Sequence, residues 1–200
     1  MSAANGRAAV FLDRDGVLNE LVPDAHSGVP ESPLRVADVR LISGAAGAAA
    51  RLQQLGFLLV CVTNQPAAAK GRISTAEVLA VHERVLALLG EAGVSLAASR
   101  ICMHHEQAVV AELAGPCPCR KPAPGMLLDA ALSLSVDLAD SWMVGDTDAD
   151  VAAGRAAGCM TVLIGNPDSA HKRLQAVSPD LRARSLAEAV AMIGAAPDVT

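Results

Sequence analysis

The strongest constraint on the fold is an alternation between short apolar runs and longer segments typical of helices. The apolar runs are bounded by turn residues and cover residues 8–12, 57–62, 100–103, 142–145 and 159–165. Segments typical of helices lie between or after them, at residues 44–56, 74–93, 124–135, 148–158 and 185–194. Strands that are apolar throughout and alternate with helices predict a parallel sheet covered on both faces. We therefore expect an α/β fold with a parallel sheet between two layers of helices, in which residues 1–200 form one domain.

Composition narrows the class of protein and the kinds of partner. With 52% hydrophobic and 18% charged residues among 200, the chain is typical of a globular protein with one core. The formal net charge of -5 disfavours a nucleic-acid partner, although a few local cations can still bind a small phosphorylated substrate. Apolar runs stay well short of the roughly 18 residues of a membrane span, and a signal peptide is not evident. We expect a cytoplasmic monomer with no membrane partner.

Polar motifs follow the apolar runs at the points where the predicted strands end. The first run leads into DRDGVLN (13–19), the second into TNQ (63–65) and the fourth into GDTDAD (145–150). Because ligands bind at the carboxyl ends of strands in open α/β sheets, these motifs should meet at one edge. A single Asp after a strand is more typical of a turn, so the hypothesis of a site rests on the whole ordered set.

The carboxylates of this set suit a magnesium ion. Asp13 and Asp15 would point the same way if the strand continued, and Asp146 arrives from another strand. A few carboxylate oxygens together with water are ligands that Mg²⁺ prefers. Beside a metal, Asp13 could attack phosphorus, while Asp15 protonates the leaving oxygen and later deprotonates water. Thr63 and Lys121 would hold the phosphate oxygens.

A C-x-H-x12-C-x-C spacing predicts a structural zinc site within a loop of about 102–119. Its four donors are Cys102, His104, Cys117 and Cys119. In a reducing cytoplasm we expect cysteines to be ligands or packing residues rather than disulfides. Three thiolates and one imidazole make a closed tetrahedral site, with no open position for chemistry. His105 is the rival ligand to His104, and a solvated loop with free thiols is the alternative to a metal site.

The predicted zinc site has a mechanical purpose, because Arg120 and Lys121 directly follow Cys119. Holding these cations in place matters, since a misplacement of about 1 Å can slow a reaction about a hundredfold. The stretch 19–36, rich in Pro, Asp and Ser, predicts a long loop or a small flap. The remaining cysteines, Cys61 and Cys159, lie in apolar runs and are expected to be core thiols.

The ordered motifs D-x-D-G, T-N, Lys and G-D-x-x-x-D resemble those of the haloacid dehalogenase (HAD) superfamily of phosphotransferases. DRDGVLN, TNQ and the cysteine segment resemble its histidinol-phosphate and heptose-bisphosphate phosphatase branch. The resemblance implies a Rossmann-like fold, a Mg²⁺ cofactor and an aspartyl-phosphate intermediate. Asp13 would then be nucleophile and Mg²⁺ ligand, and Asp15 would be general acid/base and ligate Mg²⁺ through its carbonyl. The resemblance also implies Mg²⁺ binding by Asp146, phosphate binding by Thr63 and Lys121, support by Asp150, and substrate contacts by Asn64 and Arg120.

The resemblance also suggests the substrate. A long loop between the two halves of the zinc motif, and the lack of a dehydratase domain in the chain, favour D-glycero-D-manno-heptose 1,7-bisphosphate and removal of its C7 phosphate. Arg120 and Lys70 are candidates for the second phosphate. Histidinol phosphate, another small sugar phosphate, or a zinc-stabilised binding module without catalysis are the alternatives. The loop TNQPAAAKG departs from the family pattern at Pro66, Ala67 and Lys70, where Lys lacks the bidentate fork of Arg.

Overall fold

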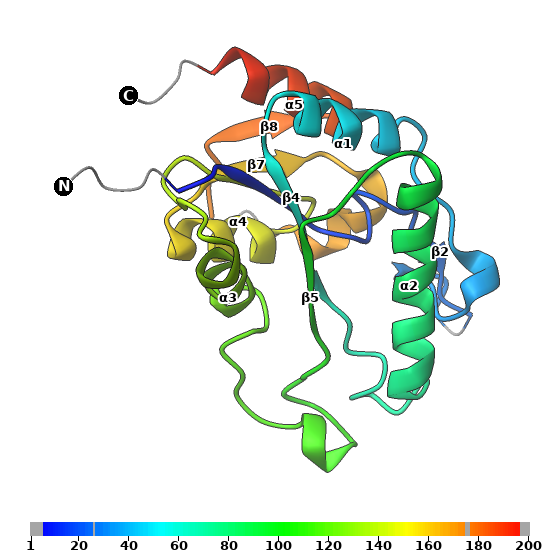
Figure 1. Cartoon of the computed structure of the whole chain (residues 1–200). Helices are drawn as coiled ribbons and strands as arrows, with labels where there is room; N and C mark the ends of the chain where they lie inside the picture. Colours follow the sequence, from blue (N-terminus) through cyan, green and yellow to red (C-terminus); the bar gives the residue numbers. More distant parts are fainter. Residues whose placement is uncertain (1–5, 26, 175–176, 197–200) are drawn as a thin grey trace.

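A six-stranded parallel sheet forms the centre of the computed structural model, which describes residues 6–25, 27–174 and 177–196 (Figure 1). The strand order is β5-β4-β1-β6-β7-β8, with bounds Ala98–Cys102, Leu58–Asn64, Ala9–Leu12, Trp142–Gly145, Met160–Ile164 and Leu181–Ala183. The chain runs from β1 outward to β4 and β5, then crosses back to β6, β7 and β8 on the other side. The strand order therefore reverses at β1, which is where open α/β sheets bind ligands.

In the described part of the chain, five α-helices cover the two faces of this sheet. Their bounds are α1 Ala45–Gln54, α2 Thr75–Glu91, α3 Gly125–Leu134, α4 Asp148–Ala157 and α5 Leu186–Ala195. Helices α1, α2 and α5 contribute to the apolar cluster on one face, and α3 and α4 contribute to the cluster on the other. None of the described helices has the length and apolar character needed to cross a bilayer.

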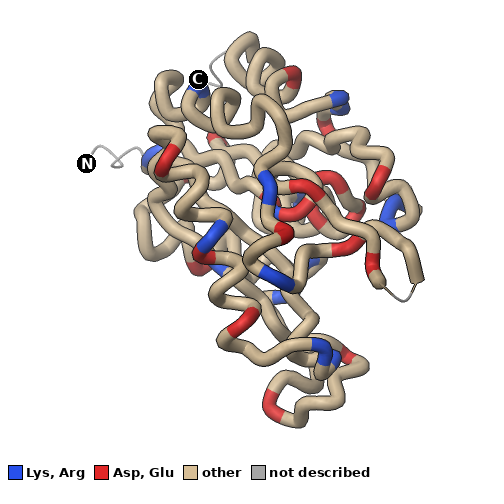
Figure 2. Tube along the Cα trace, turned by 90° about the vertical axis from the view of Figure 1, so that its right-hand side faces the viewer, with Lys and Arg blue, Asp and Glu red and all other residues tan. Residues whose placement is uncertain are grey.

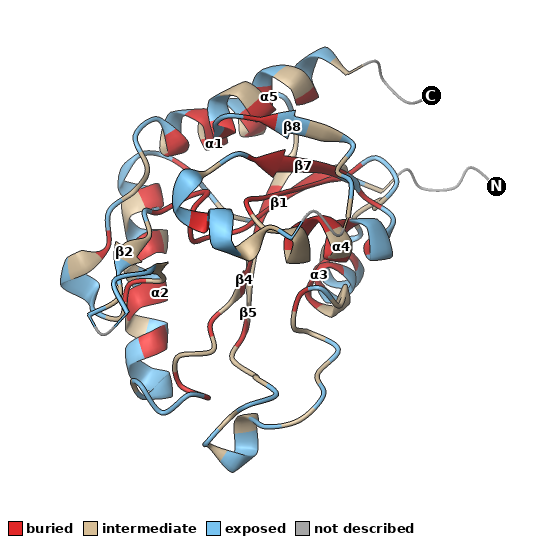
Figure 3. Cartoon of the chain, turned by 180° about the vertical axis from the view of Figure 1, so that it is seen from behind, coloured by how far each residue is buried: buried red, intermediate tan, exposed pale blue. Residues whose placement is uncertain are grey.

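The central strand shows why its sequence is apolar at every position. Val10 and Leu12 point into one cluster, while Ala9 and Phe11 point into the other. All four side chains are completely buried, because adjacent residues of a strand face opposite sides and both sides are covered. Figure 3 shows the same pattern, with buried strands inside and exposed outer faces on the helices.

The predicted α/β fold with helices on both faces is confirmed, and the structure corrects several boundaries. Strand β4 continues through Thr63 and Asn64, which the sequence places after its end. The region 166–184, which has no clear periodicity, contains the 3-10 helix η3 (Pro167–Lys172) and strand β8. These two short elements carry too few apolar residues to give a pattern in the sequence.

Two insertions stand beside the carboxyl edge of the sheet. The flap at 19–36 contains the antiparallel pair β2 (Val22–Pro23) and β3 (Pro30–Glu31), and the 3-10 helix η1 (Val36–Asp38) follows. An ion pair between Asp24 and Arg72 ties the flap to the loop after β4. The cysteine loop, which carries the 3-10 helix η2 (Ala111–Leu113), projects away from the sheet at the bottom of Figure 1.

Candidate active site

The loop after β1 forms a tight turn that presents its carboxylates at the edge of the sheet. Strand β1 ends at Leu12, and backbone N–H groups of Leu18 and Asn19 both donate to the carbonyl of Arg14. Gly16 has a φ of +84°, and a Cβ at this position would collide with the carboxylate of Asp146. Only glycine lets the turn approach Asp146 this closely.

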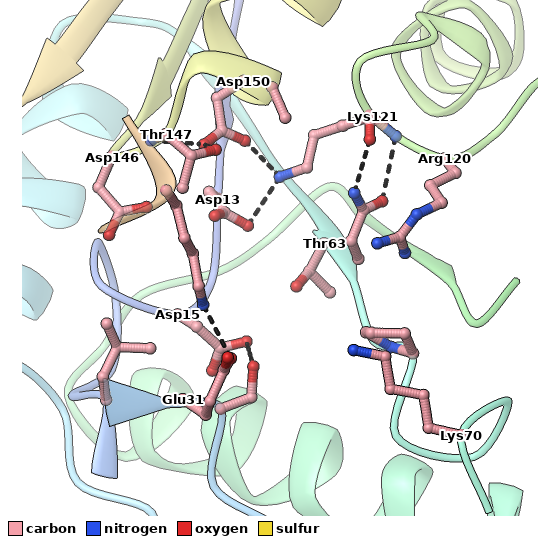
Figure 4. Close-up of a pocket in the computed structure, with 16 residues that line it drawn as sticks. Asp13, Asp15, Glu31, Thr63, Lys70, Arg120, Lys121, Asp146, Thr147 and Asp150 are labelled. Carbon is pink, nitrogen blue, oxygen red and sulfur yellow. Dashed lines mark hydrogen bonds and ion pairs between the residues drawn. The ribbon is translucent and has the colours of Figure 1, made fainter. Parts of the chain in front are cut away.

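Three carboxylates meet beneath this turn, and Lys121 lies among them (Figure 4). Oxygens of Asp13, Asp146 and Asp150 lie within 4.8 Å of one another. The Nζ atom of Lys121 is 2.8 Å from Oδ1 of Asp13 and 2.5 Å from Oδ1 of Asp150. Lys121 also donates to the carbonyl of Val62 at 2.8 Å. In Figure 2 several acidic positions lie close together near the middle of the trace, with basic positions around them, while other acidic positions are scattered over its outer parts.

Asp146 is the carboxylate whose surroundings fit a cation best. It is 1% exposed, and within the described residues neither of its side-chain oxygens has a hydrogen-bond partner. A buried carboxylate without partners is costly, and a hard divalent cation would satisfy it. The donor set of Asp146 and Asp13, both of oxygen, therefore fits Mg²⁺.

The pKa values of the cluster reflect the same crowding of negative charge. Burial and the carboxylate of Asp150 raise the pKa of Asp13 to about 7. Burial, Asp13 and Asp150 raise the pKa of Asp146 to about 8. Burial by itself lowers the pKa of Lys121, but Asp13 and Asp150 outweigh it and the pKa is raised. A bound cation would offset this repulsion and favour the ionised carboxylates.

Asp15 lies beside the triad but is held by a separate set of donors. Arg14 donates to it through Nε at 3.2 Å and through Nη2 at 3.0 Å. Side chains of Asn19, Gln65 and Ser32 donate to it at 2.9, 2.5 and 2.9 Å. Burial raises the pKa of Asp15, yet Arg14 and the other donors lower it further, so that the net pKa is below its ordinary value.

The structure brings the sequence-predicted phosphate and substrate residues to one pocket of about 270 Å³. Its lining includes the predicted Asp13, Asp15, Thr63, Asn64, Lys70, Arg120, Lys121, Asp146 and Asp150. The side chain of Asn64 bonds twice to the backbone of Lys121, accepting from its N–H at 3.1 Å and donating to its carbonyl at 2.9 Å. Asn64 thus fixes the segment that carries Lys121, and its contact with substrate stays a prediction.

Asp150 has a structural partner as well as an electrostatic one. Its Oδ2 accepts from the backbone N–H of Thr147 at 3.0 Å and from the Thr147 hydroxyl at 2.6 Å. This capping box begins α4 and holds Oδ1 of Asp150 toward Lys121. The supporting role expected for Asp150 stays a prediction.

Sequence reasoning missed four residues of the site. Glu31 and Ser32 enter from the flap and Lys172 from η3, and all three line the pocket. Arg14 lies entirely below the surface and holds Asp15 from the core side. The sequence gives little signal for Glu31, Ser32 and Lys172, because they reach the site through tertiary packing. Arg14 lies within the motif DRDGVLN, but the motif does not indicate that its side chain points into the core.

A second cluster contains the four predicted zinc donors. Donor atoms of Cys102, His104, Cys117 and Cys119 all lie within 4.8 Å of one another. The Nδ1 atom of His104 is 3.8 Å from Sγ of Cys102 and 3.7 Å from Sγ of Cys119. His105 instead uses Nδ1 to accept from the backbone of Gln107 at 3.0 Å, so His104 is the histidine in the cluster.

One feature of this cluster differs from the sequence prediction. Sulfur atoms of Cys117 and Cys119 are in contact as a disulfide, whereas reduced cysteines were expected. Two cysteine sulfurs can lie close together either because they bind the same metal ion or because they form a disulfide. A disulfide would remove two thiolate ligands from a tetrahedral zinc site. The set of three sulfurs and one imidazole nitrogen fits zinc when the pair is reduced. Arg120 connects to this cluster by donating to the carbonyl of His104 at 3.0 Å.

Comparisons with known proteins define the class to which this fold and site belong. The HAD-hydrolase-like family model matches residues 118–189. A relative from Yersinia pestis, named D-glycero-beta-D-manno-heptose-1,7-bisphosphate 7-phosphatase, is 39% identical over 156 residues, covering 78% of this chain and 79% of the relative. A Thermosynechococcus vestitus relative, named D-glycero-D-manno-heptose-1,7-bisphosphate 7-phosphatase, is 39% identical over 195 residues, covering 94% and 95%.

A solved structure leads to the same class. D,D-heptose 1,7-bisphosphate phosphatase from B. bronchiseptica, complexed with magnesium and phosphate, is 30% identical with a TM-score of 0.76, covering 93% of this chain and 97% of that chain. The chain therefore belongs to the haloacid dehalogenase family of phosphatases. Within that family it groups with the heptose-bisphosphate phosphatases.

Proposed function

We propose that the protein is a Mg²⁺-dependent phosphomonoester hydrolase that removes the C7 phosphate of D-glycero-D-manno-heptose 1,7-bisphosphate. The observation that carries this proposal is the contact of Lys121 with Asp13 at 2.8 Å beside the unpartnered, buried carboxylate of Asp146. The arrangement offers a nucleophile, a cation for phosphate oxygens and a metal ligand within one pocket. Names of relatives at 37–39% identity supply the substrate.

The metal would be held by the carboxylates of Asp13 and Asp146 and by the carbonyl of Asp15. When bound, Mg²⁺ would lower the repulsion between the carboxylate of Asp13 and an incoming phosphate dianion. Lys121 would hold the phosphate oxygens as charge spreads over them in the transition state. The hydroxyl of Thr63, which is 1% exposed, lies at the pocket and supplies a further donor.

The reaction follows from the positions of Asp13 and Asp15. An oxygen of Asp13 attacks phosphorus, the bond from phosphorus to the C7 oxygen breaks, and Asp15 gives that oxygen its proton. Water then attacks the aspartyl phosphate, Asp15 takes a proton from it, and inorganic phosphate leaves Asp13.

Asp15 must change protonation state during this cycle. Its donors favour the carboxylate, which is the form that accepts a proton in the second half. A phosphate dianion in the pocket would favour the protonated form that the first half needs, because a nearby negative charge raises the pKa of a carboxyl group.

The same proposal gives the cysteine cluster a structural role. Reduced Cys102, Cys117 and Cys119 together with His104 would hold Zn²⁺ and close the loop that ends at Arg120 and Lys121. Such a site has no open coordination position, so it would position these cations without taking part in the reaction. A cytoplasmic location, a monomeric state and one domain over residues 1–200 remain part of the proposal.

Steady-state kinetics on a panel of phosphate esters tests the proposed function. We expect the highest kcat/KM for an anomer of heptose 1,7-bisphosphate, with lower values for histidinol phosphate and fructose bisphosphate. Asp13→Asn should lose turnover with every ester, because an amide oxygen is a poor nucleophile. A larger kcat/KM for histidinol phosphate would reassign the substrate, and full activity of Asp13→Asn would refute the mechanism.

A further inference from the structure

An ion pair between Glu31 and Lys172 lies at the wall of the active-site pocket. Nζ of Lys172 is 2.9 Å from Oε2 of Glu31, and the two side chains are 31% and 41% exposed. Glu31 ends strand β3 of the flap, and Lys172 ends the 3-10 helix η3. The pair thus joins segments 141 residues apart, and both residues line the pocket.

Two other cations line the same pocket. Lys70 comes from the loop after β4, and Arg120 follows the cysteine loop. Across the ranges that the structure describes, neither of them forms an ion pair with a carboxylate. Figure 4 shows Lys70 and Arg120 on one side of the pocket and Glu31 on the other. Apart from the aspartates and Lys121, the charged side chains of the pocket are Glu31, Lys70, Arg120 and Lys172, which we call the outer pocket; it therefore has two cations outside ion-pair contact with a carboxylate and one neutral ion pair.

This charge arrangement matters most for a ligand with two phosphate groups. The reacting phosphate belongs near Asp13 and Lys121, so the second phosphate of a bisphosphate reaches the outer pocket. That group carries nearly two negative charges, and its binding depends on the net charge of the surrounding side chains. A monophosphate of the same sugar leaves the outer pocket without an anion and responds much less to that charge.

We infer that the Glu31–Lys172 pair sets the preference of the pocket for bisphosphate over monophosphate sugars. Glu31 neutralises Lys172, so the net positive charge of the outer pocket comes from Lys70 and Arg120. These two cations attract the second phosphate, and Glu31 keeps Lys172 from adding to their charge. Removing the charge of Glu31 adds one positive charge to the outer pocket, and removing that of Lys172 adds one negative charge. This inference rests on the proposed sugar-bisphosphate substrate.

If the Glu31–Lys172 pair only held the flap in place, the two variants would behave differently from what a charge role predicts. The pair connects the flap to η3, and loss of either partner breaks that connection equally. A mechanical role would therefore change the binding of both ligands in the same direction in both variants. A charge role changes their ratio in opposite directions, which separates the two explanations.

The test compares Glu31→Gln and Lys172→Met with the unchanged protein. Their kcat/KM values are measured with Mg²⁺ for D-glycero-D-manno-heptose 1,7-bisphosphate and for the corresponding 7-phosphate. We expect Glu31→Gln to raise the ratio of the two values by about three- to tenfold and Lys172→Met to lower it by about as much. Both changes should shrink when salt is raised from 0.05 to 0.5 M, because salt screens partly exposed charges.

Glu91→Gln is the matched control. It removes the charge of a carboxylate from the exposed ion pair with Arg84, whose side chains are 38% and 62% exposed and are not among the pocket-lining residues. The ratio for this variant should equal that of the unchanged protein. Ratios that move in the same direction in Glu31→Gln and Lys172→Met, or do not move, would overturn the inference.

Equilibrium binding separates this inference from the proposed function. The dissociation constants of both sugar phosphates are measured by calorimetry in an Asp13→Asn background, where turnover is removed. If the unchanged protein releases no phosphate, the proposed function fails. The inference is still supported if the ratio of the two dissociation constants shifts in opposite directions in Glu31→Gln and Lys172→Met. Absence of binding of either sugar phosphate counts against it.

Discussion

Arg14 grips Asp15 from the interior of the protein, with Nη2 3.0 Å from both carboxylate oxygens. The side chain of Arg14 is completely buried, and that of Asp15 is 9% exposed. A guanidinium with this bidentate geometry restrains the carboxylate in both position and orientation. The proposed general acid/base is therefore fixed by a residue that lies beneath the pocket and not within it.

Replacing Arg14 should cost much of the stability of the protein. Arg14→Met leaves the buried Asp15 without its charged partner, and loss of one member of a buried pair typically costs about 3–5 kcal/mol. Chemical denaturation should show this loss in the free energy of unfolding. Arg35→Met is the control, because Arg35 makes a similar bidentate pair with Asp38 but its side chain is 77% exposed. Equal effects of the two substitutions would contradict the importance of burial.

Gly16→Ala should damage the metal site more than the fold. The added Cβ would collide with the carboxylate of Asp146, so we expect kcat/KM to fall about a hundredfold, as for a displacement of about 1 Å. Gly28→Ala is the control, because Gly28 has a φ of +70° and a Cβ there meets nothing within 4 Å. Both substitutions carry the strain of a left-handed backbone, so thermal unfolding should shift similarly. Comparable activities of the two variants would disprove the steric explanation.

Cys119→Ser should separate zinc binding from folding. The substitution removes one of the four donors, and we expect bound zinc, measured by atomic emission, to be lost and kcat to fall at least tenfold. Far-UV circular dichroism should change little, because the sheet and its helices lie outside the cysteine loop. Cys159→Ser is the control, since Cys159 is a buried thiol that is not among the four clustered donors. Full turnover in a zinc-free Cys119→Ser protein would remove the positioning role.

His82 should make an acid-destabilising contribution to the free energy of unfolding, opposite in sign to the contributions of Asp13 and Asp146, whose pKa values are raised. Burial lowers the pKa of His82 to about 4, with Arg14 adding to the effect, whereas an unfolded chain has a histidine pKa near 6.5. Between these values the unfolded state binds a proton that the folded state does not, so the contribution is present above pH 6.5 and is lost as pH falls toward 4. The slope from this group can approach about 1.4 kcal/mol per pH unit.

The substitution His82→Gln measures how much of the pH dependence of the free energy of unfolding comes from the His82 side chain. The glutamine amide can still reach the hydroxyl of Ser99, which accepts or donates to Nε2 of His82 at 2.7 Å. When denaturation is measured at pH 7 and at pH 5, the free energy of unfolding of the variant should shift toward greater stability at pH 5, relative to the shift seen in the unchanged protein. An identical difference in both proteins would assign the acid sensitivity to other groups.

The sheet and the carboxylate cluster were predictable because strong patterns lie next to each other in the sequence. Apolar runs identify β1, β4 and β6, and the polar residues directly after or at the end of each run must lie at one edge of a parallel sheet. Asp13, Thr63 and Asp146 follow from this rule alone. Lys121 could be predicted only from its place in the ordered set of motifs and not from hydrophobic periodicity, since it lies between strands in an irregular segment.

The outer parts of the pocket were not predictable for a physical reason. Glu31 and Lys172 look like ordinary surface charges, and only the folding of the flap against η3 brings them together. Arg14 looks like a solvated charge within a turn, whereas it points into the core toward Asp15. Packing between distant segments sets the Glu31–Lys172 pair, and burial beneath the turn sets the direction of the Arg14 side chain; neither leaves a periodic signal in the sequence.

The position of β1 between β4 and β6 has a consequence for synthesis of the chain. Asp13 leaves the ribosome early, but the strand that places Asp146 beside it emerges more than a hundred residues later. A nascent chain therefore cannot assemble the carboxylate cluster until most of its length is available. Phosphatase activity can arise only after this segment has been translated, so the time at which activity appears would report when β6 has paired with β1.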